Sequence, residues 1–263
     1  MPRSTETRRG RLAFAAVTVA ATLLPFHSAF AQWDAPDTAG WSFELTPYFW
    51  AIAVEGDVGV RQLPEVEVDA NFSDVWDQLD FAFMGMFEAR KNRWGILFDA
   101  FYADLSADTE TRGPLFGKGE IELVQQVHSL ALAYRVNRRM PALDVVGGVR
   151  YVYTKADLDL GSGILPGRSE SRKEDWFDGF VGLRAELYVT DRWSWRAYAD
   201  IGAGGSDLTW QALGTVNYRF SDKLQLQVGY RYLSVDYDDG SGSNRFLYDV
   251  DFSGPYVGLQ FRF

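Results

Sequence analysis

The chain has 263 residues, a formal net charge of −10 and no cysteine. The acidic balance argues against nucleic acid as a partner, and the lack of cysteine excludes disulfides and thiolate metal sites. Aromatic residues make up 16% of the chain, yet after residue 31 no apolar run is long enough for a membrane-spanning helix. This combination favours strands that cross a bilayer and gather Trp, Tyr and Phe at its two interfaces.

Residues 1–31 have the features of a secretory signal peptide. An apolar segment interrupted by Pro25 follows a basic start, and residues 29–31 form a small-x-small cleavage site. We expect cleavage near Ala31 and a mature chain that starts at Gln32, which leaves 32–263 as a single domain. The basic residues of the start are Arg3, Arg8, Arg9 and Arg11.

Apolar and polar residues alternate along the rest of the chain and predict about ten strands, each long enough to cross a bilayer at a tilt. The predicted strands are 41–54, 81–90, 94–105, 121–136, 143–158, 176–189, 193–203, 208–220, 224–237 and 246–263. Tight turns alternate along the chain with long and mostly acidic connections, and three of the tight turns contain Asn or Asp followed by Arg or Lys. The long connections are 55–80, 106–120, 159–175 and 238–244. The connection 204–207 is an exception, because it is short although it belongs to the series of long ones. In transmembrane barrels the short turns face the periplasm and the long loops face outside. The fold class is therefore an all-β, transmembrane antiparallel barrel of about ten strands, with eight as the alternative.

The parity of the alternation assigns the apolar faces to lipid. Typical members of these faces are Trp41, Phe43, Leu45, Phe49, Phe81, Phe83, Phe87, Trp94, Ile96, Phe98, Val181, Leu183, Trp195, Trp210, Val228 and Tyr230. In the last strand, Phe246, Tyr248, Val250 and Phe252 have the opposite parity to Val257, Leu259 and Phe261. A bulge at Ser253-Gly254-Pro255 would return all of them to the lipid face.

The opposite faces carry acids and arginines but no lysine, since Lys91, Lys118, Lys155, Lys173 and Lys223 all lie in turns, in loops or near strand ends. Arg, whose planar fork holds two carboxylate oxygens, suits an enclosed polar interior better than Lys does. The signs nearly cancel, so we predict an ion-pair network that fills the lumen, with solvated charges in a water-filled lumen as the alternative. Its predicted members are Glu44, Glu88, Arg90, Asp99, Arg135, Asp144, Arg150, Asp178, Arg184, Glu186, Arg196, Asp200, Arg219, Arg231 and Arg262.

No catalytic site is predicted. The mature chain holds one histidine, His128, and its neighbour Ser129 is expected to point to the opposite face of the same strand, so the two cannot form a dyad without a bulge. The sequence leaves the orientation of His128 open, because its parity points to lipid and its polarity to the lumen. A site made of Asp99, Asp178 and Asp200 is conceivable, but nearby arginines would keep these carboxylates ionised and structural.

The first long connection, 55–80, contains many acids and a single arginine, Arg61. Such a segment could hold Ca²⁺ or Mg²⁺, which also bridge lipopolysaccharide phosphates, but its spacing lacks the regular pattern of a calcium loop. We therefore expect a solvated acidic surface, with no metal site and no cofactor, and divalent cations remain a possible partner.

The last ten residues alternate strictly. Val257, Leu259, Phe261 and Phe263 share one face, and Tyr256, Gly258, Gln260 and Arg262 share the other. This end resembles the final strand of small Gram-negative outer-membrane barrels of the OmpA and OmpW type. The resemblance implies a cell outer-membrane location, contact with the lipid bilayer and lipopolysaccharide, and an assembly signal at Phe261 and Phe263 that the barrel assembly machinery recognises. It carries no functional motif.

The sequence favours a non-enzymatic envelope protein with a structural or surface-interaction role and a largely plugged lumen. A narrow channel for small solutes is the first alternative, and an outer-membrane hydrolase is the second.

Overall fold

The structure is a computed structural model that describes residues 40–60, 66–109, 116–137, 141–162, 167–240 and 246–263. The predicted signal peptide and its cleavage site lie outside these residues. Within the described ranges, no helix is both long enough and apolar enough to cross a membrane.

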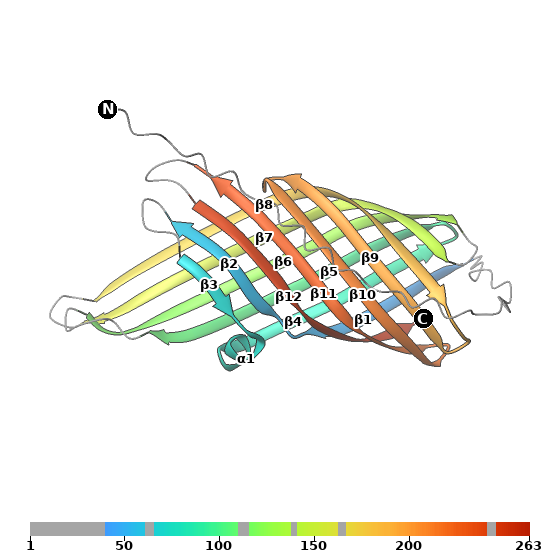
Figure 1. Cartoon of the computed structure of the whole chain (residues 1–263), viewed down its shortest axis with the longest axis horizontal. Helices are drawn as coiled ribbons and strands as arrows, with labels where there is room; N and C mark the ends of the chain where they lie inside the picture. Colours follow the sequence, from blue (N-terminus) through green and yellow to red (C-terminus); the bar gives the residue numbers. More distant parts are fainter. Residues whose placement is uncertain (1–39, 61–65, 110–115, 138–140, 163–166, 241–245) are drawn as a thin grey trace, which may run out of the picture. The chain divides into compact units, whose positions relative to one another are not determined.

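Twelve strands and one short helix make up the described chain (Figure 1). They are β1 (Trp41–Trp50), β2 (Ala53–Val60), β3 (Val66–Ala70), α1 (Phe72–Asp77), β4 (Leu79–Lys91), β5 (Trp94–Thr109), β6 (Phe116–Asn137), β7 (Ala142–Ser162), β8 (Arg168–Tyr188), β9 (Trp193–Gly204), β10 (Leu208–Ser221), β11 (Leu224–Asp239) and β12 (Phe246–Arg262). Neighbours pair antiparallel in the order β1, β4 to β12, and β1 pairs with β12 to close the ring. Because β2 and β3 add to the outer end of β12 and lie outside this ring, the closed barrel has ten strands, as predicted.

The strands extend further outward than the sequence analysis predicted. β6, β7 and β8 have 22, 21 and 21 residues, whereas a bilayer crossing takes about 9–11. Figure 1 shows these three strands extending far from the end of the barrel at which the C-terminus lies. The predicted long loops are therefore wrong in length: much of 106–120 and 159–175 is paired strand, and the acidic segment 55–80 contains most of β2 together with β3 and α1.

The tight turns lie at the opposite end. Asn92 has a φ of 54°, the left-handed conformation expected for a short hairpin. Asp191 and Asp222, in the turns after β8 and β10, are not among the described residues with positive φ.

The pairing between β1 and β4 covers only part of the two strands. Their pairing runs from Trp41 opposite Lys91 to Pro47 opposite Gly85, and ends there. Above this point the backbone N–H of Trp50 donates to the sulfur of Met84, 3.3 Å away. The chain then continues through β2, returns through β3, and passes through α1 before β4 begins.

The helix α1 has two different sides. Phe72 and Trp76 are exposed and contact Phe49 edge-on, with ring centroids 6.0 and 5.6 Å away, whereas Val75 and Gln78 line an interior cavity. Asn71 caps the helix, accepting from the N–H groups of Ser73 and Asp74. This short element thus separates the lumen from the barrel's apolar surroundings.

Two aromatic girdles mark where the lipid-facing band begins and ends. Near the tight turns the Trp94 ring packs at a tilt against that of Tyr134, and the similar pair of Trp193 and Tyr218 has the same centroid distance of 4.8 Å. Near the outer end Trp210 stacks on Tyr232, with centroids 4.6 Å apart. Between the girdles the outward side chains are large and apolar, and Val181 is 64% exposed. The predicted lipid faces are confirmed in this band.

Beyond the outer girdle the inward face of the strands is apolar and the outward face is polar, the reverse of the arrangement between the girdles. On β11 the inward residues Leu233, Val235 and Tyr237 are buried and apolar, while Asp236 faces outward. Outside a bilayer an apolar interior and a polar exterior are the stable arrangement, as in a soluble barrel.

The predicted bulge at Ser253-Gly254-Pro255 is wrong. The register of β12 against β11 continues through these residues without a shift, so Phe246, Tyr248, Val250 and Phe252 face the interior, where each is at most 7% exposed. The irregularity lies in the neighbouring strand, in the break between β1 and β2. A Cβ on Gly254 would lie 1.8 Å from the carbonyl oxygen of Ala51, so glycine is required for this close approach.

Candidate functional site

The most distinctive chemistry of the molecule is in the lumen between the two girdles. Nearest the tight turns, Arg184 donates from Nη1 and Nη2 to the two carboxylate oxygens of Glu88 at 2.6 and 3.0 Å. Its Nη2 also reaches Asp144 at 2.7 Å. Asp144 is 1% exposed and accepts from Arg90 at 2.8 Å and from Arg135 at 2.7 Å. We call these five residues the inner cluster.

Two further pairs extend this end of the lumen. Arg196 lies 3.2 Å from Glu186, and Arg262 donates to Glu44 at 2.7 Å, which ties β12 to β1 where the barrel closes. The Arg219 guanidinium lies 5.2 Å from the centre of the Tyr188 ring, a cation–π contact.

A second group, the central cluster, is built around two arginines that are nearly or fully buried. Arg150 is 0% exposed and donates to both oxygens of Asp200, at 2.8 and 2.9 Å. Arg231 is 3% exposed and donates to Asp99 at 2.6 Å and to the hydroxyl of Tyr48 at 2.8 Å. A buried guanidinium that is held by a carboxylate and a second acceptor has its charge paired and its position fixed by hydrogen bonds.

Asp178 does not join an arginine. It is 0% exposed and accepts from the backbone N–H and the hydroxyl of Ser206, both at 2.8 Å. The carboxylate therefore fastens the short outer turn between β9 and β10 to the wall of β8, and this explains why 204–207 can be so short.

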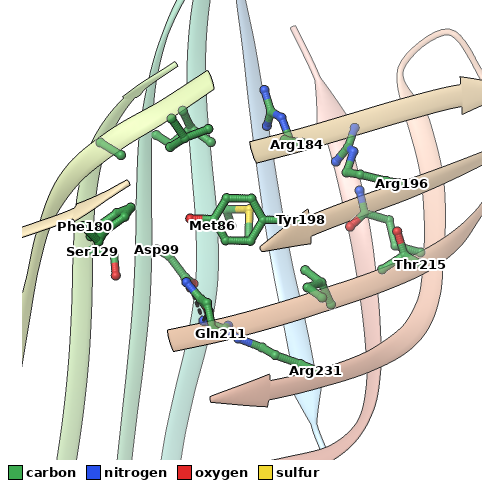
Figure 2. A pocket seen from close by; sticks show the side chains of 15 residues that line it. Met86, Asp99, Ser129, Phe180, Arg184, Arg196, Tyr198, Gln211, Thr215 and Arg231 are labelled. Atoms are coloured by element: carbon green, nitrogen blue, oxygen red, sulfur yellow. Dashed lines mark hydrogen bonds and ion pairs between the residues drawn. The ribbon is translucent and has the colours of Figure 1, made fainter. Parts of the chain in front are cut away.

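A small cavity separates the two clusters (Figure 2). Its volume is about 60 Å³ and its walls include Arg184, Arg196, Tyr198, Gln211 and Arg231. This volume holds roughly two water molecules. The inner and central clusters, with the pairs of Arg196 and Arg262, thus leave little free space, and we call them together the charged plug.

Neutral polar side chains complete the plug, and the sequence analysis did not assign them. Gln211 bridges the central cluster: it donates to Asp200 at 2.6 Å and accepts from Arg231 at 2.9 Å. A separate group of buried amides lies near the tight turns, where Gln225 and Gln227 both donate to Gln260. The sequence contains the information that places them in the lumen, because these glutamines share the parity of the charged residues.

His128 faces away from the lumen, which resolves the orientation that the sequence left open. Its ring lies between those of Phe98 and Tyr151, each with a centroid 6.4 Å away, and its Nε2 is 3.2 Å from the amide oxygen of Gln126. Ser129 points inward and accepts from Arg150 at 3.4 Å. The two side chains are therefore on opposite faces, as predicted.

The three acids considered for a carboxylate site each have their own partners: Asp99 binds Arg231, Asp200 binds Arg150, and Asp178 binds Ser206. In the part of the chain that the structure describes, no group of three His, Asp or Glu side chains could hold a metal ion.

No family model and no curated protein matches the chain. Among solved structures it is similar to the outer-membrane protease OmpT from Escherichia coli, with 9% identity, a TM-score of 0.47, and coverage of 87% of this chain and 99% of that one. It is also similar to the translocator domain of the autotransporter NalP from Neisseria meningitidis, with 15% identity, a TM-score of 0.39, and coverage of 86% and 90%. A third similarity is to the attachment invasion locus protein Ail of Yersinia pestis, with 14% identity, a TM-score of 0.38, and coverage of 85% and 99%. Identities this low say nothing about activity, ligand or partner.

The pairing of the strands and the distribution of apolar and charged side chains assign the fold without these similarities. The strands pair in a closed ring, the exterior of the band between the two aromatic girdles is apolar, and the interior of this band is charged. With these features the chain is an outer-membrane β-barrel.

Proposed function

We propose that the protein is a non-conducting, non-enzymatic barrel of the cell outer membrane, with a structural or surface-interaction role. The charged plug carries this proposal. Arg184, Arg150 and Arg231 are each at most 7% exposed and each is held by at least one carboxylate from another strand. Moving an ion past them would require breaking buried ion pairs, at a cost of several kcal/mol each.

The outer part of the molecule supports a surface role. Beyond the outer girdle, the exterior of β11, β12, β2 and β3 places acids directly opposite one another: Asp236 faces Asp249, Asp249 faces Asp57, and Asp251 faces Glu55. Acids opposed in this way repel each other. Such a surface favours cationic partners, and the divalent cations that bridge lipopolysaccharide phosphates belong to this class.

The surroundings of His128 and of the lumen acids support the absence of an enzymatic role. His128 is set among aromatic rings on the lipid-facing side, and Asp99 and Asp200 are neutralised by arginine. A general base must contact its substrate, and neither a histidine on the lipid-facing side nor a buried carboxylate held by arginine is placed to do so.

The test is conductance in planar bilayers. The unmodified protein should show no steady current, whereas Arg184→Ala and Arg196→Ala should open small channels because each removes a bulky side chain beside the 60 Å³ cavity. Arg192→Ala, in the exposed turn between β8 and β9, is the matched control and should stay closed. Large, stable, salt-dependent channels from the unmodified protein would establish the alternative of a solute channel.

A further inference from the structure

A second, larger cavity lies in the outer half of the barrel, beyond the charged plug. Its volume is about 360 Å³, which is within the range of small-molecule sites. Its walls come from β2, β3, α1, β5, β6, β7, β8 and β12. The apolar part of the lining includes Ile52, Val54, Val58, Val68, Phe101, Leu105, Phe246, Tyr248, Val250 and Phe252.

The charged plug is shut off from this cavity by aromatic side chains. Trp50 is 2% exposed and packs edge-on against Phe101, with ring centroids 6.0 Å apart. The guanidinium of Arg231 lies on the other side, 4.9 Å from the Trp50 ring. A molecule in the cavity would therefore meet apolar walls and would not compete with the ion pairs below it.

The lining also contains two buried hydrogen-bond donors without an acceptor in the described structure. Gln125 is 4% exposed; its amide oxygen accepts from the Tyr248 hydroxyl at 3.0 Å, and its Nε2 has no partner. The Nε of Arg172 is likewise unpaired, although its Nη2 binds Glu174 at 2.7 Å. A buried donor left unpaired is destabilising, so an acceptor brought by a ligand would be favoured.

The charge of the cavity defines the ligand further. The positive charge of Arg172 is already matched by Glu174, and no other charged side chain is part of the described lining. A carboxylate would meet Glu174 beside the only cation available to it. The site therefore suits an uncharged molecule better than an anion.

We propose that the outer cavity is a binding site for a small, uncharged apolar molecule that carries one hydrogen-bond acceptor, such as a medium-chain ketone or ester. At about 30 Å³ for each water-sized group, the cavity volume admits roughly twelve non-hydrogen atoms. The apolar body contacts the walls of β2, β5 and β12, and the acceptor takes the hydrogen bond from Gln125 Nε2. This function goes beyond the proposed structural role and does not depend on whether the barrel conducts.

The experiment uses the full mature protein in lipid nanodiscs and the fluorescence of 1-aminoanthracene, which increases in an apolar site. Displacement is measured with 2-undecanone, dodecane and decanoate, which are matched at roughly twelve non-hydrogen atoms. Saturable binding above empty nanodiscs is expected. The ketone should displace the probe at a concentration about tenfold lower than dodecane, the value of one hydrogen bond, and also at a lower concentration than decanoate.

Three variants locate the site. Val250→Trp fills the cavity and should abolish probe binding, whereas Val257→Trp places the same side chain on the lipid face of the same strand and should leave it unchanged. Gln125→Leu should remove the advantage of the ketone over dodecane without weakening dodecane itself. Gel mobility before and after boiling shows that each variant has folded.

Some outcomes would overturn the proposal. These are a signal no greater than that of empty nanodiscs, a Val250→Trp protein that folds and binds like the unmodified one, or a ketone preference that survives Gln125→Leu. Stronger displacement by decanoate would overturn the assignment to an uncharged ligand.

Discussion

The guanidinium of Arg231 lies 4.9 Å from the centre of the Trp50 ring, and this contact marks the boundary between the two halves of the lumen. On one side of it, Arg231 is bound to Asp99 and Tyr48. On the other side, Trp50 packs against Phe101 and the interior becomes apolar. A cation–π contact allows a buried charge to meet an apolar layer with little loss of stabilisation.

Trp50 should therefore be among the most costly residues to truncate. Trp50→Ala should lower the free energy of unfolding by about 3–5 kcal/mol, because it leaves a void and removes the ring above Arg231. Urea unfolding in detergent micelles measures the change. Trp195→Ala removes the same ring from a lipid-facing position that is 60% exposed, and a loss as large as that of Trp50→Ala would contradict the boundary role.

The inner cluster predicts a large effect at Arg184. Arg184→Ala leaves Glu88 and Asp144 with one fewer cation each and should lower the free energy of unfolding by on the order of 3 kcal/mol. The control is Arg219→Ala, since Arg219 contacts the Tyr188 ring and is in none of the ion pairs described above. Equal losses for the two variants in the same unfolding assay would mean that ion pairing is not what stabilises this end of the lumen.

The position of the lipid-facing band predicts where a charged side chain is tolerated on the outer face of a strand. Within the band it should be destabilising, and beyond the outer girdle it should not. Leu183→Arg, between the girdles on β8, should cost about 2–4 kcal/mol, the range for a basic residue near the bilayer midplane. Ser171→Arg has the same parity on the same strand but lies beyond the outer girdle, so it should cost little. If both substitutions fold into liposomes with the same yield and stability, the assigned membrane boundary is wrong.

The C-terminal strand predicts an assembly defect. Removing Phe263, or replacing Phe261 with Asp, should reduce the amount of folded protein in the outer membrane, because both changes alter the end that resembles an assembly signal. Asp222→Asn, in the turn between β10 and β11, is a control that should leave the yield unchanged. Outer-membrane fractionation and gel mobility before and after boiling give the readout, and unchanged yields for the Phe variants would remove the role assigned to these residues.

The acidic exterior predicts a dependence on pH. Beyond the outer girdle, burial and then the neighbouring Asp236, Asp251 and Asp57 raise the pKa of Asp249. A carboxyl group whose pKa is raised by folding stabilises the fold at low pH, and this contribution is lost as the pH rises through the folded-state value. Hydrogen exchange should therefore show the outer sheet of β2, β3 and β12 better protected at about pH 5 than at about pH 7. Asp249→Asn should increase protection at the higher pH and weaken the pH dependence, and an unchanged dependence would rule out this cause.

Local sequence patterns were sufficient for the barrel and for most of the charged lumen. Strict alternation fixes which residues share a face, and the choice of Arg over Lys on the polar faces indicates confinement. All but two of the predicted lumen residues form ion pairs in the structure; the exceptions are Asp178, which binds Ser206, and Arg219, which contacts Tyr188. These two could not be separated from the others by sequence, since parity gives the face of a residue and not its partner.

The sequence by itself therefore indicated the ten crossing strands and the faces of their lipid-facing band, because these depend on residues close together in the chain. Only the tertiary structure decided where lipid ends. Phe246 and Tyr248 have the alternation of a lipid-facing strand, but they lie beyond the outer girdle, where water surrounds the barrel and apolar side chains turn inward. The height of each residue relative to the membrane depends on the tilt and register of all ten strands, and for this reason the apolar cavity could not be predicted from the alternating pattern.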